Sequence, residues 1–550
     1  MTYAPHNPLI AQSDHTLLLE TLSPRYAEAR DALLAFAELV KSPEYVHTWR
    51  ITALSLWNAA AAGHTADDVI AALERFAKYP IPPNVLHTVR EKLERYGRLR
   101  LVRDGEWLRL EADDPHDLEA VTSLSATEGL FTAVPDEPEA LRVRPAQRGE
   151  VKRLLTHLGH PVADLAGYDD GDEVAMALTN GWSIRDYQLA AVDQFTTGPA
   201  AGSGVVVLPC GAGKTVVGIG AMVRLGMRTL ILCASQQALT QWRREILAKT
   251  TLREEDVAEY SGERKQLGLV TLTTYQLLTW RRAKHLAPAH FSLFSQANWG
   301  LVIYDEVHLL PAPIFRESAE LQARRRLGLT ATLVREDGLE GDVFALVGPK
   351  LFDVPWRQLE QQGWIAEARC VEVRVPATDD DRALTLVVPE RDRYPIAARN
   401  PRKGVFLERL LARHEGEAVL VLGTYVEQLV FFGRRFGFPV ITGDTPNRER
   451  EALYQRFREG EIRVLGLSKV GNFSVDLPSA AVAIQLSGTY GSRQEEAQRL
   501  GRILRPKDNG NQAVFYTLVT EHSAEQPFAE RRQLFLTEQG YPYTIEAAEP

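Results

Sequence analysis

The chain has 550 residues, enough for roughly three or four domains, and its 45% hydrophobic and 25% charged residues are typical of a folded protein. It contains no run of about 18 apolar residues and begins without a basic stretch followed by an apolar one, so we expect a cytoplasmic protein with no membrane span. Three cysteines without a CxxC pair argue against a disulfide framework or a zinc site, and the net charge of −9 argues against a protein that coats nucleic acid passively.

The N-terminal region is predicted to be mostly helical, with a β-hairpin at its end. A capping-box spacing at Thr65 and Asp68 opens one amphipathic helix, and the prolines that follow end it. A second amphipathic helix leads to alternating strands around the turn at Asp104 and Gly105. This order indicates a winged-helix-like unit, whose role could be DNA contact, protein docking or packing.

After a proline-rich stretch and a short helix, short apolar strands alternate with amphipathic helices in two series. Each series predicts a parallel sheet with helices on both faces. Between them, residues 355–399 are predicted to form a less regular connector in which the acidic run at 379–381 is exposed loop. The predicted strands are Val205–Leu208, Thr229–Leu232, Val270–Leu272, Leu301–Tyr304 and Leu327–Leu329, then Val419–Leu422, Val440–Ile441, Val464–Leu467, Ala481–Leu486 and Val514–Tyr516.

The first of these strands runs into a glycine-rich loop and then a helix, the context that a P-loop requires. Glycines let backbone N–H groups turn toward phosphate oxygens, and the helix N-terminus adds partial positive charge. We expect Lys214 to reach the β- and γ-phosphates of ATP and the Thr215 hydroxyl to hold Mg²⁺. The rest of the predicted phosphate loop is Pro209, Cys210, Gly211, Ala212 and Gly213.

Two adjacent carboxylates, Asp305 and Glu306, follow the buried strand that ends at Tyr304. At the end of such a strand, downstream of a P-loop, Asp305 can bind Mg²⁺ directly or through water. Glu306 can then orient or deprotonate the attacking water. His308 completes an Asp-Glu-Val-His (DEVH) box and could relay nucleotide state, although a lone histidine is more often structural.

Residues 498–505, Gln-Arg-Leu-Gly-Arg-Ile-Leu-Arg, form the third element, on a predicted helix with a capping-box spacing at its start. Arg502 and Arg505 lie close together on one face of this helix. They could stabilise negative charge on the transferring phosphoryl group, as arginine fingers do. The alternative is that they belong to a basic helix exposed to solvent. Together the three elements predict an α/β protein with two tandem RecA-like P-loop domains, with ATP between the lobes.

Over nearly its whole length the sequence resembles the XPB family of superfamily 2 DNA helicases, in its bacterial form. Residues 52–61 resemble the start of the family's N-terminal domain, and residues 531–541 resemble its C-terminal segment. Gln188, in Ser-Ile-Arg-Asp-Tyr-Gln, matches the glutamine that reads adenine. Arg335, Glu336 and Asp337 match the family's RED motif, associated with strand separation, although they could also be an ordinary ion-pair cluster.

Further roles are implied only by this resemblance. Gln241 and Thr274 match first-lobe motifs that track DNA, and Asn472 stands where the family has an aspartate. The second-lobe motif that touches both nucleotide and DNA is matched by Ser468, Lys469 and Asp476, with Asp476 on the ATP side. Coupling of hydrolysis to movement is implied for His308, Thr330, Ala331, Thr332 and Gln498.

The resemblance implies 3′→5′ translocation and unwinding of DNA in repair, driven by ATP and Mg²⁺. It divides the chain into an N-terminal domain (1–121), a linker with a small accessory segment (122–178), an ATP-binding lobe (179–368) and a second lobe (369–550). Two alternatives stay open: a duplex translocase that does not separate strands, and an ATP-switched scaffold that recruits a repair nuclease.

Overall fold

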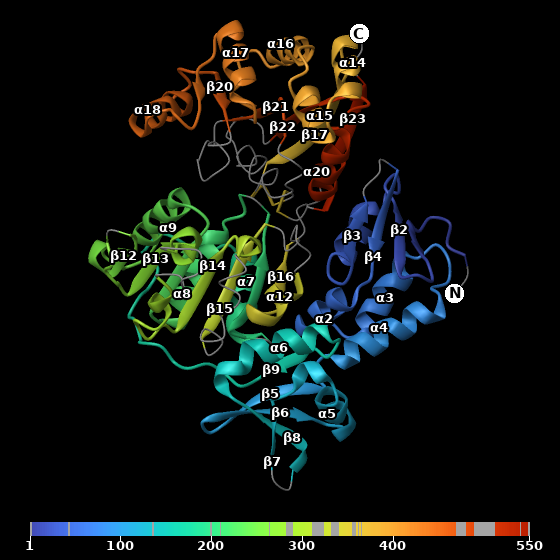
Figure 1. The fold of residues 1–550 in the computed structure, drawn as a ribbon, viewed down its shortest axis with the longest axis vertical. Coiled ribbons are helices and arrows are strands. Elements are labelled where there is room, and N and C mark those ends of the chain that lie inside the picture. Colours follow the sequence, from blue (N-terminus) through green and yellow to red (C-terminus); the bar gives the residue numbers. More distant parts are fainter. Residues whose placement is uncertain are drawn as a thin grey trace. The chain divides into compact units, whose positions relative to one another are not determined.

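The computed structural model describes most of the chain (Figure 1). The described ranges are 3–41, 45–134, 137–198, 201–209, 211–262, 264–281, 290–310, 324–331, 340–354, 359–360, 362–364, 366–468, 480–488, 512–538 and 541–547. The chain divides into two compact units: the first holds most of residues 1–353 and the second holds most of residues 354–550. No helix within the described ranges is both long enough and apolar enough to cross a membrane.

The N-terminal part of the first unit combines a small sheet with helices. Its strands lie in the order β1-β2-β4-β3, a sheet that sequence patterning did not predict. Helix α3 begins at the predicted capping box, because Thr65 and Asp68 each accept the other's backbone N–H. The elements are β1 (Leu9–Ala11), β2 (Thr16–Glu20), α1 (Tyr26–Leu33), β3 (Glu38–Lys41), β4 (Val46–Arg50), α2 (Ala53–Ala61), α3 (Ala66–Phe76) and α4 (Pro83–Arg95).

The predicted hairpin belongs to a five-stranded sheet in the order β7-β8-β6-β5-β9. Its two strands pair up to Asp104 and Trp107, as the Asp-Gly turn indicated. The segment that follows, read from sequence as linker and accessory segment, supplies the other three strands and α6, which packs on helix α12 of the P-loop lobe. The elements are β5 (Leu99–Asp104), β6 (Trp107–Ala112), α5 (Pro115–Thr122), β7 (Thr132–Val134), β8 (Glu137–Val143), α6 (Arg148–His157) and β9 (Val162–Asp164).

A parallel sheet in the order β12-β13-β11-β14-β15-β10-β16 forms the centre of the P-loop lobe. All five predicted strands are confirmed, and β12 and β16 add the two edges. The strands are apolar without alternation because helices cover both faces. The elements are α7 (Asp186–Thr197), β10 (Ser203–Val207), α8 (Lys214–Leu225), β11 (Thr229–Cys233), α9 (Gln236–Lys249), β12 (Val257–Glu259), β13 (Val270–Thr274), α10 (Tyr275–Thr279), β14 (Leu301–Asp305), β15 (Arg325–Thr330), α12 (Glu340–Leu346) and β16 (Lys350–Asp353).

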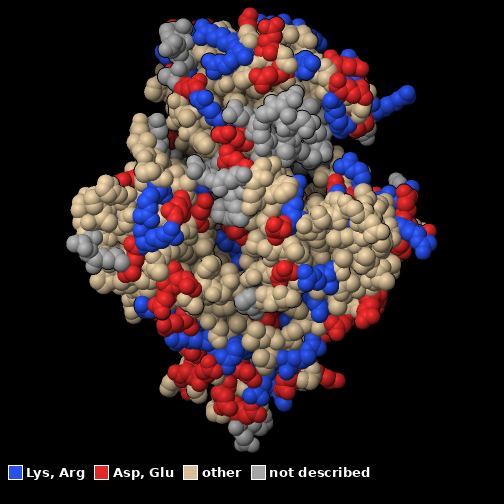
Figure 2. Space-filling model, turned by 180° about the vertical axis from the view of Figure 1, so that it is seen from behind, with Lys and Arg blue, Asp and Glu red and all other residues tan. Residues whose placement is uncertain are grey.

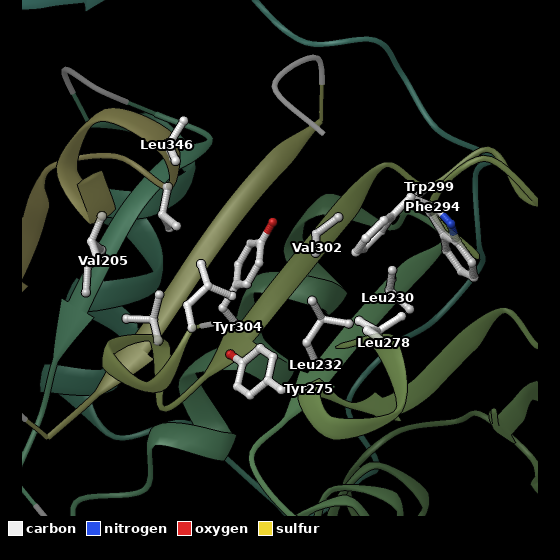
Figure 3. Packing of buried hydrophobic residues seen from close by; sticks show 14 of the residues in the cluster. Val205, Leu230, Leu232, Tyr275, Leu278, Phe294, Trp299, Val302, Tyr304 and Leu346 are labelled. Atoms are coloured by element: carbon white, nitrogen blue, oxygen red, sulfur yellow. The ribbon is translucent and has the colours of Figure 1, made fainter. Parts of the chain in front are cut away.

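One face of this sheet carries a continuous apolar cluster, which Figure 3 shows at close range. Leu232, Val302 and Tyr304 come from neighbouring strands, and Tyr275 and Leu278 of α10 pack against them. Burying a side chain of this size stabilises the fold by about 1.5–3 kcal/mol. The cluster therefore fixes α10 and the carboxyl ends of β11 and β14 relative to one another.

The second unit is built on another parallel sheet, in the order β19-β20-β18-β21-β22-β17-β23. All five predicted strands are again present, so the predicted pair of parallel α/β lobes is confirmed. The elements are β17 (Glu367–Val375), α14 (Asp379–Val387), α15 (Glu390–Ala398), α16 (Lys403–Arg413), β18 (Val419–Leu422), α17 (Val426–Phe436), β19 (Val440–Ile441), α18 (Asn447–Arg458), β20 (Val464–Leu467), β21 (Val482–Gln485), β22 (Gln512–Thr520), α20 (Gln526–Glu538) and β23 (Tyr543–Ala547).

The connector expected over residues 355–399 is more regular than predicted, since it holds β17, α14 and α15. The acidic run at 379–381 is not a loop but the first turn of α14. Thr378 caps this helix, with its hydroxyl accepting the Asp381 N–H at 3.0 Å. Negative charge is stabilised at a helix N-terminus by the helix dipole, which explains why the three aspartates lie there.

The second unit buries a complete ion pair. Lys403 Nζ lies 2.8 Å from Glu525 Oε2, and the two side chains are 0% and 1% exposed. The ammonium also donates to the Leu486 carbonyl, and Glu525 accepts the Thr520 N–H. Such a pair is stable only while both charges are present, because removing one leaves the other buried without compensation.

Replacing Lys403 by methionine should therefore lower the free energy of unfolding of the second unit by about 3–5 kcal/mol. Arg435→Met is the matched control, since Arg435 and Glu408 form an exposed pair 3.4 Å apart, which contributes much less. Calorimetric unfolding of the full chain measures both losses. Equal losses in the two variants would contradict a stabilising role for the buried pair.

Candidate active site

The P-loop leaves the carboxyl end of β10 beside β15. Leu208 donates its backbone N–H to the Thr330 carbonyl at 3.0 Å. Gly211 and Gly213 have φ angles of +82° and +80°, a left-handed conformation that favours glycine. A Cβ on Gly213 would also lie 2.5 Å from the side-chain nitrogen of Gln188. Position 213 therefore needs glycine for two reasons: its backbone is left-handed, and a side chain there would collide with Gln188.

The loop then closes a tight turn and enters α8. The Ala212 N–H donates to the Pro209 carbonyl at 3.1 Å. Gly213 is the N-cap, so Lys214 and Thr215 form the first turn of the helix. The free N–H groups and partial positive charge at such a helix start suit a phosphate group.

The predicted carboxylates lie at the carboxyl end of β14 and point to different partners. Glu306 Oε1 lies 3.3 Å from Lys214 Nζ, so the sequence-predicted lysine and glutamate are brought together. Glu306 has a φ of +50°, which is uncommon for a residue other than glycine and is often found at functional sites. Burial would raise the pKa of Glu306, but Lys214 and then His308 hold that pKa below its ordinary value.

Asp305 is held by two aromatic side chains. The Trp242 indole Nε1 donates to Asp305 Oδ2 at 3.0 Å, and the Tyr275 hydroxyl donates to the Asp305 carbonyl at 2.9 Å. Burial, followed by the neighbouring charge of Glu306, raises the pKa of Asp305 to about 7. When both carboxylates are ionised, they carry more negative charge than Lys214 alone offsets, so a bound cation would favour the ionised form of Asp305.

Magnesium fits this donor set. Mg²⁺ takes oxygen ligands and is usually held by one or two protein groups together with substrate phosphates. Asp305 and Thr215 offer a carboxylate and a hydroxyl oxygen beside the phosphate loop. Among the described residues there is no cluster of three or more histidine, cysteine, aspartate or glutamate side chains that could hold a metal without such help.

His308 connects the glutamate to the next strand. Its Nδ1 lies 3.5 Å from Glu306 Oε2 and 2.6 Å from the Thr330 hydroxyl at the end of β15. The backbone of Ala331 also hydrogen-bonds to Glu306. The structure describes three of the predicted coupling residues, and all three cluster around the Glu306 carboxylate: His308, Thr330 and Ala331.

Gln188 is buried in α7 and fixed before any nucleotide binds. Its side-chain oxygen accepts the Arg185 N–H at 3.1 Å, and its nitrogen lies 3.3 Å from the Tyr187 hydroxyl. It is only 3% exposed and adjoins Gly213. The predicted adenine-reading residue thus lies next to the phosphate loop.

The predicted DNA-contacting residues are more dispersed. Gln241 is half-buried on α9, and Ser468 is buried at the end of β20. The Thr274 hydroxyl accepts the Leu277 N–H at 3.3 Å and so caps α10. The remaining predicted site residues lie outside the described ranges: Cys210, Thr332, Arg335, Glu336, Asp337, Lys469, Asp476, Gln498, Arg502 and Arg505.

Sequence reasoning missed the role of Trp242. Its helical spacing with Leu239 and Ile246 is typical of a core residue, and it is only 1% exposed. Its indole nitrogen nevertheless reaches the active site, and a Cβ on Gly218 of α8 would lie 2.4 Å from its ring. A helical apolar pattern indicates burial but does not reveal which acceptor the indole N–H of the buried ring bonds to.

Three family models match the chain: "ERCC3/RAD25/XPB C-terminal helicase" over residues 359–549, "Type III restriction enzyme, res subunit" over 182–335, and "Helicase conserved C-terminal domain" over 9–133. A protein of Mycobacterium tuberculosis named "DNA 3′-5′ helicase XPB" is 51% identical, over 98% of this chain and 98% of that protein. The chain belongs to the XPB family.

Members of the XPB family in eukaryotes match as well. The Saccharomyces cerevisiae "General transcription and DNA repair factor IIH helicase/translocase subunit XPB/SSL2" is 33% identical, over 98% of this chain and 71% of that protein. The solved structure "ATP-dependent Type ISP restriction-modification enzyme LlaBIII bound to DNA" matches with a TM-score of 0.50 and 15% identity, covering 67% of this chain and 31% of that one. This last likeness concerns the fold alone.

Trp242→Phe should lower ATP turnover about tenfold, because it removes a hydrogen bond to a buried carboxylate, worth about 1.5–3 kcal/mol, while keeping an aromatic ring. Trp299→Phe is the matched control: Trp299 is fully buried in the same lobe, and its Nε1 donates at 3.0 Å to the Leu293 carbonyl. Steady-state ATPase rates and melting temperatures of both variants make the comparison. Equal rates in the two variants would exclude a role for the Trp242 bond in turnover.

Proposed function

We propose that this chain is an ATP-dependent DNA helicase of superfamily 2 that moves 3′→5′ and separates duplex DNA during repair. The observation that carries the proposal is the arrangement at the carboxyl ends of β10, β14 and β15. There, a P-loop lysine contacts a half-buried glutamate, and a histidine links that glutamate to the next strand. Membership of a family whose named relatives are 3′-5′ DNA helicases supports the substrate and the polarity.

In this proposal the P-loop backbone and Lys214 bind the phosphates of ATP, and Gln188 reads the adenine. Thr215 and Asp305 hold Mg²⁺, which supplies positive charge to the phosphates when it is bound. Glu306 orients the attacking water and takes its proton, a task for which a carboxylate that stays ionised is suited. Lys214 holds Glu306 in that ionised form, since it keeps the pKa of this side chain low.

Other roles stay proposals, and many of them fall on residues outside the described ranges. Arg502 and Arg505 stabilise charge on the transferring phosphoryl group, and Asp476 contacts the nucleotide. Contacts with DNA are assigned to Gln241, Thr274, Arg335, Glu336, Asp337, Ser468 and Lys469, and coupling to His308, Thr330, Ala331, Thr332 and Gln498.

We extend the proposal to the whole chain in the divisions 1–121, 122–178, 179–368 and 369–550. The two lobes drive movement, and the N-terminal part either contacts DNA or recruits a partner such as a repair nuclease. We propose that the protein acts in the cytoplasm. Acidic and basic side chains are interspersed on the face shown in Figure 2, so attraction to DNA is expected from local cationic tracks rather than from the whole surface.

ATP hydrolysis should rise sharply when single-stranded or duplex DNA is added, and Lys214→Ala and Glu306→Gln should each nearly abolish it without unfolding the chain. Lys214→Ala removes the phosphate contact, and Glu306→Gln removes the proton acceptor. Unwinding should require a 3′ overhang, and DNA binding should weaken steeply with salt, because phosphate contacts release counterions. Normal turnover in either variant would overturn the active-site assignment.

A slow ATPase that DNA does not stimulate would favour the ATP-switched scaffold over the motor. DNA-stimulated hydrolysis without strand separation on any overhang would favour the duplex translocase. Overhang polarity and the DNA response together therefore distinguish the three functions.

Thr330→Val should uncouple hydrolysis from unwinding. The side chain is fully buried, and valine keeps its shape while removing the hydroxyl that meets His308. We expect DNA-stimulated ATP hydrolysis close to wild type, with about tenfold fewer base pairs separated per ATP, as loss of one buried hydrogen bond worth about 1.4 kcal/mol implies. Parallel phosphate-release and fluorescence unwinding assays measure the ratio, and an unchanged ratio would contradict coupling through this bond.

A further inference from the structure

A row of three aromatic rings leads from the interior of the P-loop lobe to its surface. Tyr260 and His290 are buried, with ring centroids 5.8 Å apart at 82°, and Trp280 is 49% exposed, with its centroid 6.0 Å from that of His290. The Tyr260 hydroxyl also lies 3.3 Å from His290 Nδ1. The exposed indole therefore contacts a buried ring on one side and is about half open to solvent.

Trp280 is also tied to the active site by a short path. It directly follows α10, which starts at Tyr275 at the carboxyl end of β13. The Tyr275 hydroxyl donates to the backbone carbonyl of Asp305. The helix that positions Trp280 thus rests on the strand end that carries the catalytic carboxylates, at the edge of the sheet where ligands of α/β proteins bind.

Positive charge accompanies the exposed ring. Arg281 is the next residue, and Lys265 is close enough to act on His290. Burial and then Lys265 lower the pKa of His290, so at neutral pH the ring behind Trp280 is an uncharged aromatic one. An aromatic face beside cations is the pattern by which proteins bind single-stranded nucleic acid, since bases stack on the ring while phosphates meet the cations.

An isolated exposed aromatic residue is common on protein surfaces and indicates nothing by itself. Trp280 differs in three respects: its ring contacts that of His290, on which Lys265 also acts; Arg281 follows it directly; and Tyr275 joins the preceding helix to Asp305. No motif that pointed to DNA contact includes it. These features set it apart from Tyr79, whose ring is exposed to a similar extent (48%) but stacks on Tyr3.

We propose that Trp280 is a stacking platform for an unpaired base of the DNA strand, with Lys265 and Arg281 meeting the adjacent phosphates. The inference rests on the proposed helicase function and adds a base contact to the backbone contacts assigned there. Because Tyr275 links α10 to Asp305, the platform lies where the nucleotide state of the first lobe can reach the bound strand.

The test measures affinity of the full-length protein for a 20-nucleotide oligothymidylate and for a matched strand with abasic positions. Trp280→Ala should weaken binding of the oligothymidylate about tenfold, the usual effect of losing one base stack, and leave binding of the abasic strand unchanged. Trp280→Phe should retain most of the affinity, and Tyr79→Ala should match wild type on both strands. Hydrolysis of ATP without DNA should be normal in all three variants.

A salt series separates stacking from charge. Lys265→Ala should weaken both strands alike and reduce the slope of log affinity against log salt by about 0.7, the value for one phosphate of a single strand. Trp280→Ala should leave that slope unchanged. Equal affinity of wild type and Trp280→Ala for oligothymidylate would overturn the platform, and so would an equal loss on the abasic strand. Absence of DNA binding by the wild-type protein would instead overturn the proposed function.

Discussion

The active site depends on keeping two adjacent, half-buried carboxylates at the end of one strand. Like charges at neighbouring positions repel strongly away from water, so each must have its own partners. The structure separates them: Asp305 faces Trp242, whereas Glu306, in a left-handed backbone conformation, faces Lys214 and His308. Lys214 keeps Glu306 in the ionised form that can accept a proton, and a cation bound at Asp305 would offset the charge that burial disfavours there.

Much of this site could be predicted because its residues are close in sequence or follow apolar strands. Lys214 and Thr215 are fixed by the loop before them, and the pair at 305 and 306 by the strand before it. Contacts between residues that are distant in sequence, which tertiary packing creates, could not be predicted. Trp242 lies 63 residues from Asp305 along the chain, and its helical spacing indicated a core position without naming a hydrogen-bond partner.

In the fold, too, local sequence patterns predicted some elements, whereas others depend on tertiary contacts. Continuous apolar runs marked ten strands correctly because buried parallel strands need no polar face. Strand β17 was missed because Glu367, Arg369, Glu372 and Arg374 interrupt its apolar residues. Glu372 is nevertheless 1% exposed and accepts a hydrogen bond from the Tyr543 hydroxyl of β23, a neighbour that no local pattern could reveal. The strands at 132–134 and 137–143 were missed because prolines lie in and around them.

Asp305 is also the point where the proposed nucleotide and DNA functions meet. Its side chain is bound by α9 through Trp242, and its backbone by α10 through Tyr275. Gln241 lies on the first of these helices, Thr274 caps the second, and Trp280 directly follows the second. One residue thus contacts both elements to which DNA contacts are assigned in the proposals above. If Mg²⁺ binds at Asp305 as proposed, these two hydrogen bonds are the direct routes by which its binding would act on α9 and α10.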